Sequence, residues 1–403
     1  MKPHPFRSAL LASLLAATPL LAASADRDVR AFAAGERLAP VLESSPESAS
    51  RTFVRTVVPV AGRAAAEIPA TGTGTLLVWV LPAPSDGTPA MRAGDAAGGG
   101  LATRLVSPSG ETLGPDADGA RGDAARRFRF EGFGGEELGL PVGTRQETLR
   151  VLAPEAGAWR VEVDAPDAPA VTVVAAELES PLVLATWASP LSRQPGEPVA
   201  LHARLSDGAA GVAAVVSARL APAAGAAGEP VLLFDDGAHG DGAAGDGHYA
   251  TTVADPGPLS AGPVAVRFDA EGVDARGHAF ARTGSSGFVN ERGDARLVPG
   301  SARAEWVGEG DARALRVSAE ARVLVGGRYR LDVFAGGESA GDGSRAAYAR
   351  AERTEELGPG LATLDVEIPA ALLGNESSLH LDLRVVGLSR PALAGRETLD
   401  LAR

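Results

Sequence analysis

The stretch that decides the fold class is Leu315-Arg316-Val317-Ser318-Ala319-Glu320-Ala321-Arg322-Val323. Apolar and polar residues alternate along it with a period of two, and successive side chains of a β-strand point to opposite faces of the sheet. The stretch therefore predicts a strand with one apolar and one charged face, as in an antiparallel sheet that covers a core on one side only.

The same alternation recurs along most of the chain after residue 50. Further examples are Trp159–Asp164, Val199–Leu205, Val264–Asp269 and Leu379–Val385. Short strands at regular spacing, separated by Gly, Pro and Asp turns, are typical of β-sandwiches rather than of parallel α/β folds. We therefore predict an all-β protein made of tandem β-sandwich domains, immunoglobulin-like or jelly-roll-like, with Trp159 in a core.

The first 25 residues have the pattern of a secretory signal peptide. A basic start with Lys2 and Arg7 precedes the apolar run Ala9–Ala23, and the run ends in small residues. The rival interpretation, a membrane anchor, needs about 20 apolar residues, and this run is shorter. We predict cleavage after Ala25, a secreted or periplasmic protein, and no membrane span in the mature chain.

Three domains are predicted to follow the signal peptide. Residues 26–180 form an N-terminal β-sandwich domain, in which weak helical periodicity over residues 27–43 predicts a short helix. Residues 181–292 form an immunoglobulin-like domain that contains an Asp/Gly-rich loop, and residues 293–403 form a C-terminal immunoglobulin-like domain. The last two have about the usual length of such a domain, roughly 100 residues.

Composition excludes several classes of function. The formal net charge is −13, and such a field repels nucleic acid. The chain has no cysteine, so disulfides, thiol catalysis and cysteine-ligated metal sites are excluded. Its only lysine, Lys2, lies in the signal peptide, which excludes Schiff-base chemistry in the mature chain.

The Asp/Gly-rich loop is the segment with the most chemistry. Residues 234–251 read Phe-Asp-Asp-Gly-Ala-His-Gly-Asp-Gly-Ala-Ala-Gly-Asp-Gly-His-Tyr-Ala-Thr. Hard cations such as calcium take six to eight oxygen ligands from carboxylates and carbonyls on flexible loops. The four carboxylates are therefore candidate ligands of a structural calcium ion: Asp235, Asp236, Asp241 and Asp246.

Two other interpretations of this loop stay open. In one, the Asp-Gly pairs make hairpin turns and the charges face water; the spacing does not match an EF-hand. In the other, His239 and His248 bind zinc together with Asp241, although the spacing matches no recurrent zinc motif.

The loop also carries a resemblance. Leu233–Gly237, Gly240-Asp241 and Gly245–Tyr249, preceded by Pro195–Val199 and Ser206–Gly208, resemble a bacterial extracellular β-sandwich module with the pattern Asp-Asp-Gly…Gly-Asp-Gly-x-Tyr. The whole layout is similar to a family of secreted bacterial proteins, domain of unknown function 4785. The resemblance implies an immunoglobulin-like fold and export. It implies no activity, so no catalytic residues carry over. Where the family has Thr or Ser after the tyrosine, this chain has Ala250.

The sequence predicts a protein that is not an enzyme. The zinc-protease motif His-Glu-x-x-His is absent, and His202 and His380 fall on the polar phase of alternating strands, where we expect them to face solvent. We predict no catalytic and no cofactor-binding residues, and a role in binding or presenting a partner, a protein or a surface glycan, at or outside the cell surface.

Two alternatives remain for the function. One is an extracellular hydrolase, or an accessory subunit of one, with its site in the N-terminal domain. The other is a periplasmic assembly or chaperone factor that pairs an edge strand with its client.

Overall fold

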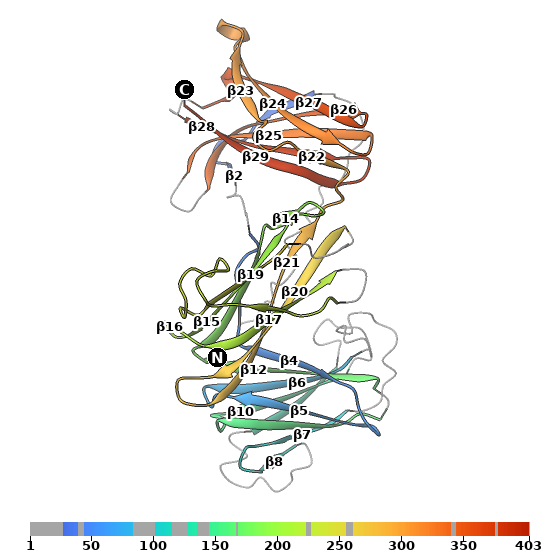
Figure 1. Cartoon of the computed structure of the whole chain (residues 1–403), viewed down its shortest axis with the longest axis vertical. Helices are drawn as coiled ribbons and strands as arrows, with labels where there is room; N and C mark the ends of the chain where they lie inside the picture. The colour runs from blue at the N-terminus through green and yellow to red at the C-terminus, as the bar shows by residue number, and fades with distance from the viewer. Residues whose placement is uncertain are drawn as a thin grey trace. The chain divides into compact units, whose positions relative to one another are not determined.

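The computed structural model of the chain contains strands and two short 3-10 turns, and no α-helix occurs among the residues that it describes. These residues are 27–38, 44–83, 101–114, 128–134, 145–166, 168–222, 227–254, 261–339, 344–374 and 378–402. The predicted signal peptide, residues 1–25, lies outside them. In the described ranges no helix is long and apolar enough to cross a membrane. The predicted all-β fold of tandem sandwiches is confirmed (Figure 1).

The first sandwich lies between residues 52 and 178. One sheet has the strand order β4 (Thr52–Val57), β12 (Ala170–Leu178), β6 (Thr75–Ala83), β10 (Arg145–Leu152) and β9 (Phe128–Gly134). The other has the order β5 (Arg63–Ala70), β11 (Gly157–Asp164), β7 (Ala102–Val106) and β8 (Thr112–Leu113). Trp159 of β11 is 2% exposed in the core between the sheets, as predicted.

The second sandwich contains the Asp/Gly-rich loop. Its first sheet is built from β16 (Ala210–Gly211), β15 (Val199–Asp207), β13 (Leu182–Ser189) and β3 (Ser48–Ser50), and β19 (His248–Val253) also pairs with β15. Its second sheet has the order β14 (Ser192–Arg193), β21 (Ala279–Asn290), β20 (Gly262–Val273), β17 (Ala214–Pro222) and β18 (Val231–Leu233). Phe268, Phe280 and Phe288 are buried in the core between these sheets.

The third sandwich combines the two ends of the chain. Its larger sheet has the order β1 (Arg27–Ala31), β26 (Arg345–Leu357), β25 (Gly327–Ser339), β28 (Ser378–Gly387) and β29 (Ala392–Ala402), and β2 (Arg37–Leu38) also pairs with β26. The smaller sheet contains β22 (Ala295–Leu297), β24 (Ala314–Val323), β23 (Arg303–Val307) and β27 (Gly360–Pro369). The alternating stretch 315–323 is β24, and it turns Leu315, Val317 and Ala319 into the core.

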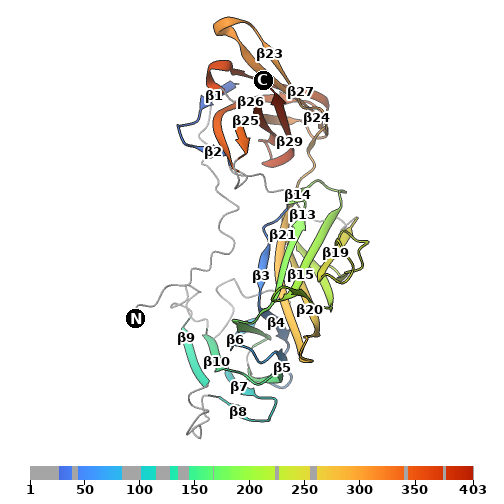
Figure 2. The ribbon, with the colours of Figure 1, turned by 90° about the vertical axis from the view of Figure 1, so that its left-hand side faces the viewer.

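The helix predicted over residues 27–43 was wrong, because the described part of this segment forms β1 and β2 along the edge of β26 (Figure 2). Val29 pairs with Ala351, so the pairing joins opposite ends of the sequence. Backbone hydrogen bonds to a distant strand outweigh the weak local periodicity.

The opening residues of the predicted N-terminal domain are therefore shared among the three sandwiches. β1 and β2 lie in the third sandwich, β3 in the second and β4 in the first. The chain groups into two compact units, Met1–Pro40 with Asp294–Arg403, and Val41–Gly293. The first and second sandwiches thus belong to one unit.

A buried ion pair joins these two sandwiches. Glu177 of β12 and Arg282 of β21 are 3% and 2% exposed, and Arg282 Nη2 lies 2.5 Å from Glu177 Oε2. The backbone N–H and the hydroxyl of Thr71 donate to Glu177 Oε1 at 2.7 and 2.9 Å. Arg282 also donates to the carbonyl oxygens of Ala281 and Leu182. Since both charges have several partners, the pair escapes the cost of an unsatisfied buried charge.

Neighbouring contacts extend the same junction. Arg267 donates to the carbonyl oxygen of Val54 at 2.6 Å, and the Thr283 hydroxyl accepts from the backbone N–H of Val54 at 3.1 Å. Ala281 of β21 is part of the hydrophobic core of the first sandwich. One strand therefore contributes to both cores, which explains why the two sandwiches form one unit.

The substitution Glu177→Gln tests this junction. It leaves Arg282 buried without its counter-charge, and breaking such a pair costs about 3–5 kcal/mol. We expect a loss of this size in the free energy of unfolding of the unit, measured by urea denaturation of the mature chain with tryptophan fluorescence. The control Glu162→Gln breaks an exposed pair with Arg160 and should cost less than about 1 kcal/mol. Equal effects of the two substitutions would contradict the role given to Glu177.

Candidate functional site

The Asp/Gly-rich loop connects β18 to β19, and its carboxylates accept hydrogen bonds from its own backbone. Asp235 accepts from the N–H groups of Gly245, Asp246 and Gly247 at 2.7, 3.2 and 3.0 Å. Asp246 accepts from the N–H of His248 at 2.9 Å. Asp235 therefore holds the two ends of the loop together.

Asp241 is the one loop carboxylate with no exposed surface. It accepts from the N–H groups of Gly237 at 2.6 Å and His239 at 3.1 Å. The hydrogen bond from Gly237, supported by the one from His239, holds the pKa of Asp241 below its usual value. The carboxylate thus stays ionised and acts as an internal acceptor of the loop.

Asp236 faces solvent and pairs with a histidine. His239 Nδ1 lies 3.0 Å from Asp236 Oδ1, and the imidazole stacks on Phe234 with ring centroids 4.6 Å apart. The hydrogen bond with His239, and then that from the N–H of Ala238, lower the pKa of Asp236.

Glycine is required where the loop contacts β16. Gly247 has a φ of 83°, and a Cβ there would lie 2.6 Å from the Cα of Gly211. A Cβ on Gly211 would in turn lie 2.3 Å from the carbonyl oxygen of Asp246. The two backbones therefore pack closer than side chains allow.

The structure does not bring the predicted metal ligands together. Across the described ranges, no group of three His, Cys, Asp or Glu side chains could hold a metal ion. The carboxylates are directed toward backbone N–H groups, and His239 and His248 belong to separate contacts. The four loop carboxylates, and the trio of Asp241, His239 and His248, therefore do not form a metal site of three or more ligands in this conformation, and calcium binding by this loop stays a prediction.

A cluster of aromatic rings lies beside the loop on the outer face of the sheet. Trp187 of β13 stacks on His202 of β15, with centroids 5.0 Å apart and an interplanar angle of 7°, and on His248 of β19 at 5.2 Å and 28°. His202 Nδ1 lies 3.3 Å from His248 Nε2. Burial, and then the neighbouring His248, lower the pKa of His202. We call Trp187, His202 and His248 the imidazole cluster.

Sequence reasoning found only part of this arrangement. The alternation places His202 on the outward face, but the side chain is half-buried under its neighbours. His380 was expected to face solvent, and this was wrong: it is 9% exposed, and its Nδ1 lies 2.7 Å from Asp400 Oδ1. Both side chains are covered by residues of a neighbouring strand, and the local sequence pattern does not show which strand that is.

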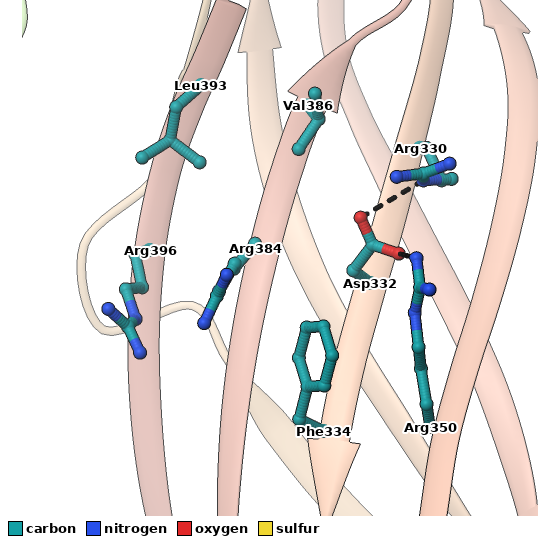
Figure 3. A pocket seen from close by; sticks show the side chains of 8 residues that line it. All are labelled: Arg330, Asp332, Phe334, Arg350, Arg384, Val386, Leu393 and Arg396. Carbon is teal, nitrogen blue, oxygen red and sulfur yellow. Dashed lines mark hydrogen bonds and ion pairs between the residues drawn. The ribbon is translucent and has the colours of Figure 1, made fainter. Parts of the chain in front are cut away.

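The outer face of the larger sheet in the third sandwich contains a hollow of about 400 Å³. Phe334 lies at one end of it, between Arg350 and Arg384, whose guanidinium carbons lie 5.4 and 4.8 Å from the ring centroid (Figure 3). Its lining consists of Arg330, Asp332, Phe334, Arg350, Arg384, Val386, Leu393 and Arg396. We call these eight residues the arginine hollow.

Two buried aspartates hold the arginines in place. Asp332 pairs with Arg330 at 3.0 Å and with Arg350 at 2.8 Å. Asp382 accepts two hydrogen bonds from Arg396, both at 2.6 Å, and another from Arg384 at 2.8 Å. Burial alone would raise the pKa of Asp382, but the hydrogen bonds from Arg396 and Arg384 outweigh burial and lower it.

The arginine hollow keeps unused capacity to bind anions. Glu352 also contacts Arg330 and Arg350, and Asp28 of β1 acts electrostatically on Arg350, so four carboxylates surround the four arginines. Each guanidinium has five N–H donors, more than the contacts to the aspartates use. The hollow therefore combines an aromatic floor with oriented cationic donors.

We expected the chain to contain no Gly-x-Ser-x-Gly motif, and this was wrong. Gly337–Gly341 has the Gly-x-Ser-x-Gly spacing of a hydrolase nucleophile, centred on Ser339. That motif works at a sharp turn from a strand into a helix. Here Ser339 ends β25 and pairs with Arg345 of β26 in an antiparallel hairpin. The surroundings of Ser339 are therefore not those of a nucleophile elbow.

Comparison with known proteins supports the fold. Residues 182–289 match the family described as the second immunoglobulin-like domain of conditioned medium factor. A crystal structure of a DUF4785 family protein from Legionella pneumophila is similar over 93% of this chain and 92% of its own, with 13% identity and a TM-score of 0.62. These findings confirm the resemblance to bacterial proteins with immunoglobulin-like domains and no assigned function.

A second solved structure is less similar. The propeptide form of the Bacillus licheniformis lipase BlEst2 matches 60% of this chain and 42% of its own, with 16% identity and a TM-score of 0.34. A TM-score of this size supports no argument about fold or function. No protein with a curated description matches the chain.

Thermal melts with and without calcium test the role of the loop. If the loop is held by its own hydrogen bonds, Asp241→Ala lowers the melting temperature by several degrees whether millimolar calcium or a chelator is present. The control Asp207→Ala changes a carboxylate outside the loop and should have little effect. A calcium-dependent rise for the wild type that Asp246→Ala abolishes would instead establish the predicted calcium site.

Proposed function

We propose that the protein is an exported, non-catalytic binding protein whose arginine hollow recognises a partner that presents carboxylate groups at or outside the cell surface. The observation that carries the proposal is the set of four arginines, held around Phe334 by buried aspartates. Arginines fixed in this way lose little side-chain entropy when they bind a carboxylate, and their planar forks match its geometry.

The location of the hollow suits recognition. It lies on the outward face of β25, β26, β28 and β29, while the opposite face of the same strands covers the core with Leu331, Val333 and Leu383. Binding on an open sheet face needs no rearrangement of the core. The apolar side chains Val386 and Leu393 lie at one end of the hollow and would contact apolar groups next to the carboxylate.

The histidine environments support a non-catalytic role. His239 contacts Asp236, His278 contacts Asp274, His380 contacts Asp400, and His202 contacts His248. A nucleophilic hydrolase needs a histidine within reach of a hydroxyl or thiol, and none of these contacts supplies one.

Export supports the choice of partner. Cleavage of the proposed signal peptide would leave a mature chain that begins at Asp26. Mass spectrometry of the protein purified from a bacterial periplasm would show whether cleavage occurs there. A protein in that location meets acidic proteins and acidic surface glycans. Both present carboxylates, and the sources can be separated experimentally.

Binding of polyglutamate and of polygalacturonate to the mature chain tests the proposal, since the first represents an acidic protein and the second an acidic glycan. We expect one of them to bind at low ionic strength and to be released as salt is raised, because exposed charges are screened beyond about 10 Å at 0.1 M. Arg330→Gln with Arg350→Gln should weaken binding at least tenfold, since each charge-assisted contact contributes about 1.5–3 kcal/mol.

The matched control is Arg316→Gln. Arg316 lies in β24 of the other sheet and pairs with Glu367 at 2.8 Å, so its loss should leave binding unchanged. Circular dichroism melts confirm that each variant is folded. Failure of both polymers to bind, or equal weakening by the control, would overturn the proposal.

A further inference from the structure

The imidazole cluster has a geometry that neither the loop nor the arginine hollow explains. His202 and His248 come from the neighbouring strands β15 and β19, and Arg204 of β15 is the cross-strand partner of His248. The nitrogens Nδ1 of His202 and Nε2 of His248 face each other at 3.3 Å. Both side chains are half-buried and reach solvent on the outer face of the sheet.

This separation suits two ligands of one metal ion. Zinc binds histidine nitrogens at about 2.0–2.1 Å in tetrahedral sites, which puts two such nitrogens roughly 3.3–3.4 Å apart. We propose that His202 and His248 form an open binding site for a divalent transition-metal ion that prefers imidazole and tetrahedral geometry, zinc in particular. This site is independent of the proposed function.

The surroundings hold both rings in place. Trp187 stacks on each imidazole, and the antiparallel ladder pairs Trp187 with His202. Because the rings are already oriented, metal binding costs little side-chain entropy.

The protons balance without a redox step. In the absence of metal, one of the two facing nitrogens carries a hydrogen and donates it in a hydrogen bond to the other nitrogen. Metal binding needs both facing nitrogens free, so that hydrogen moves to the outer nitrogen of the same ring through solvent. Each imidazole stays neutral, and the ion keeps its charge.

Nearby charges allow an ion at this position. Arg204 lies over the Trp187 ring, with its guanidinium carbon 5.4 Å from the centroid, and pairs with Glu47 at 3.7 Å. Glu47 therefore offsets the repulsion between Arg204 and a bound cation. In the described part of the chain no third carboxylate, thiolate or imidazole completes the set, so water would fill the remaining positions.

Zinc titration of the untagged mature chain by calorimetry tests the inference, with cobalt as a spectroscopic substitute for zinc. We expect one zinc ion to bind in the micromolar range. Bound cobalt should give the visible absorption of a tetrahedral ion and quench the fluorescence of Trp187, and zinc should reverse both changes. His202→Gln and His248→Gln should each weaken binding about tenfold or more.

The control His239→Gln removes a histidine that pairs with Asp236 outside the cluster, and it should bind zinc like the wild type. Lowering the pH of the wild type to about 4.5 protonates histidine and should release the ion, a readout that needs no variant. The inference is overturned if the wild type binds no zinc at millimolar concentration, or if His202→Gln and His248→Gln leave binding unchanged.

Discussion

The ion pair between Glu177 and Arg282 is the contact on which the larger unit depends. It joins β12 of the first sandwich to β21 of the second, with both side chains almost completely buried. Two charges in such a position are tolerated only when every polar atom around them has a partner. Thr71, Ser180 and the carbonyl oxygens of Ala281 and Leu182 supply those partners. The junction therefore fixes how the two sandwiches pack, because a shift of either one would leave a buried charge without its partner.

In the third sandwich, strands from the N-terminal part of the described chain extend one edge of a sheet. An unpaired edge strand exposes N–H and C=O groups that can pair with another chain. Here β1 and β2 pair along β26, so that β1 and β29 stand at the two ends of the described strand order. Strand addition by a client, the chaperone alternative, would therefore take place at β1 or β29 and not at β26.

The sequence was sufficient to predict the fold class, because period-two alternation depends only on local geometry. Stretches such as 199–205 and 315–323 form β15 and β24 with the expected faces inward. The pairing of Val29 with Ala351 and the contact of His202 with His248 depend on which strands become neighbours, and no local pattern encodes that choice. The Asp/Gly-rich loop was recognised as a special segment. However, the use of its carboxylates as backbone acceptors follows from the path of the loop, which composition does not reveal.

Native-state hydrogen exchange of the mature chain tests the central claim that the first and second sandwiches form one cooperative unit. The account predicts that the backbone amides of Val161 and Val266, in the two different cores, exchange through the same unfolding event with the same free energy and denaturant dependence. Free energies for the two amides that differ by more than about 1 kcal/mol would mean separate unfolding of the two sandwiches. That result would contradict the account.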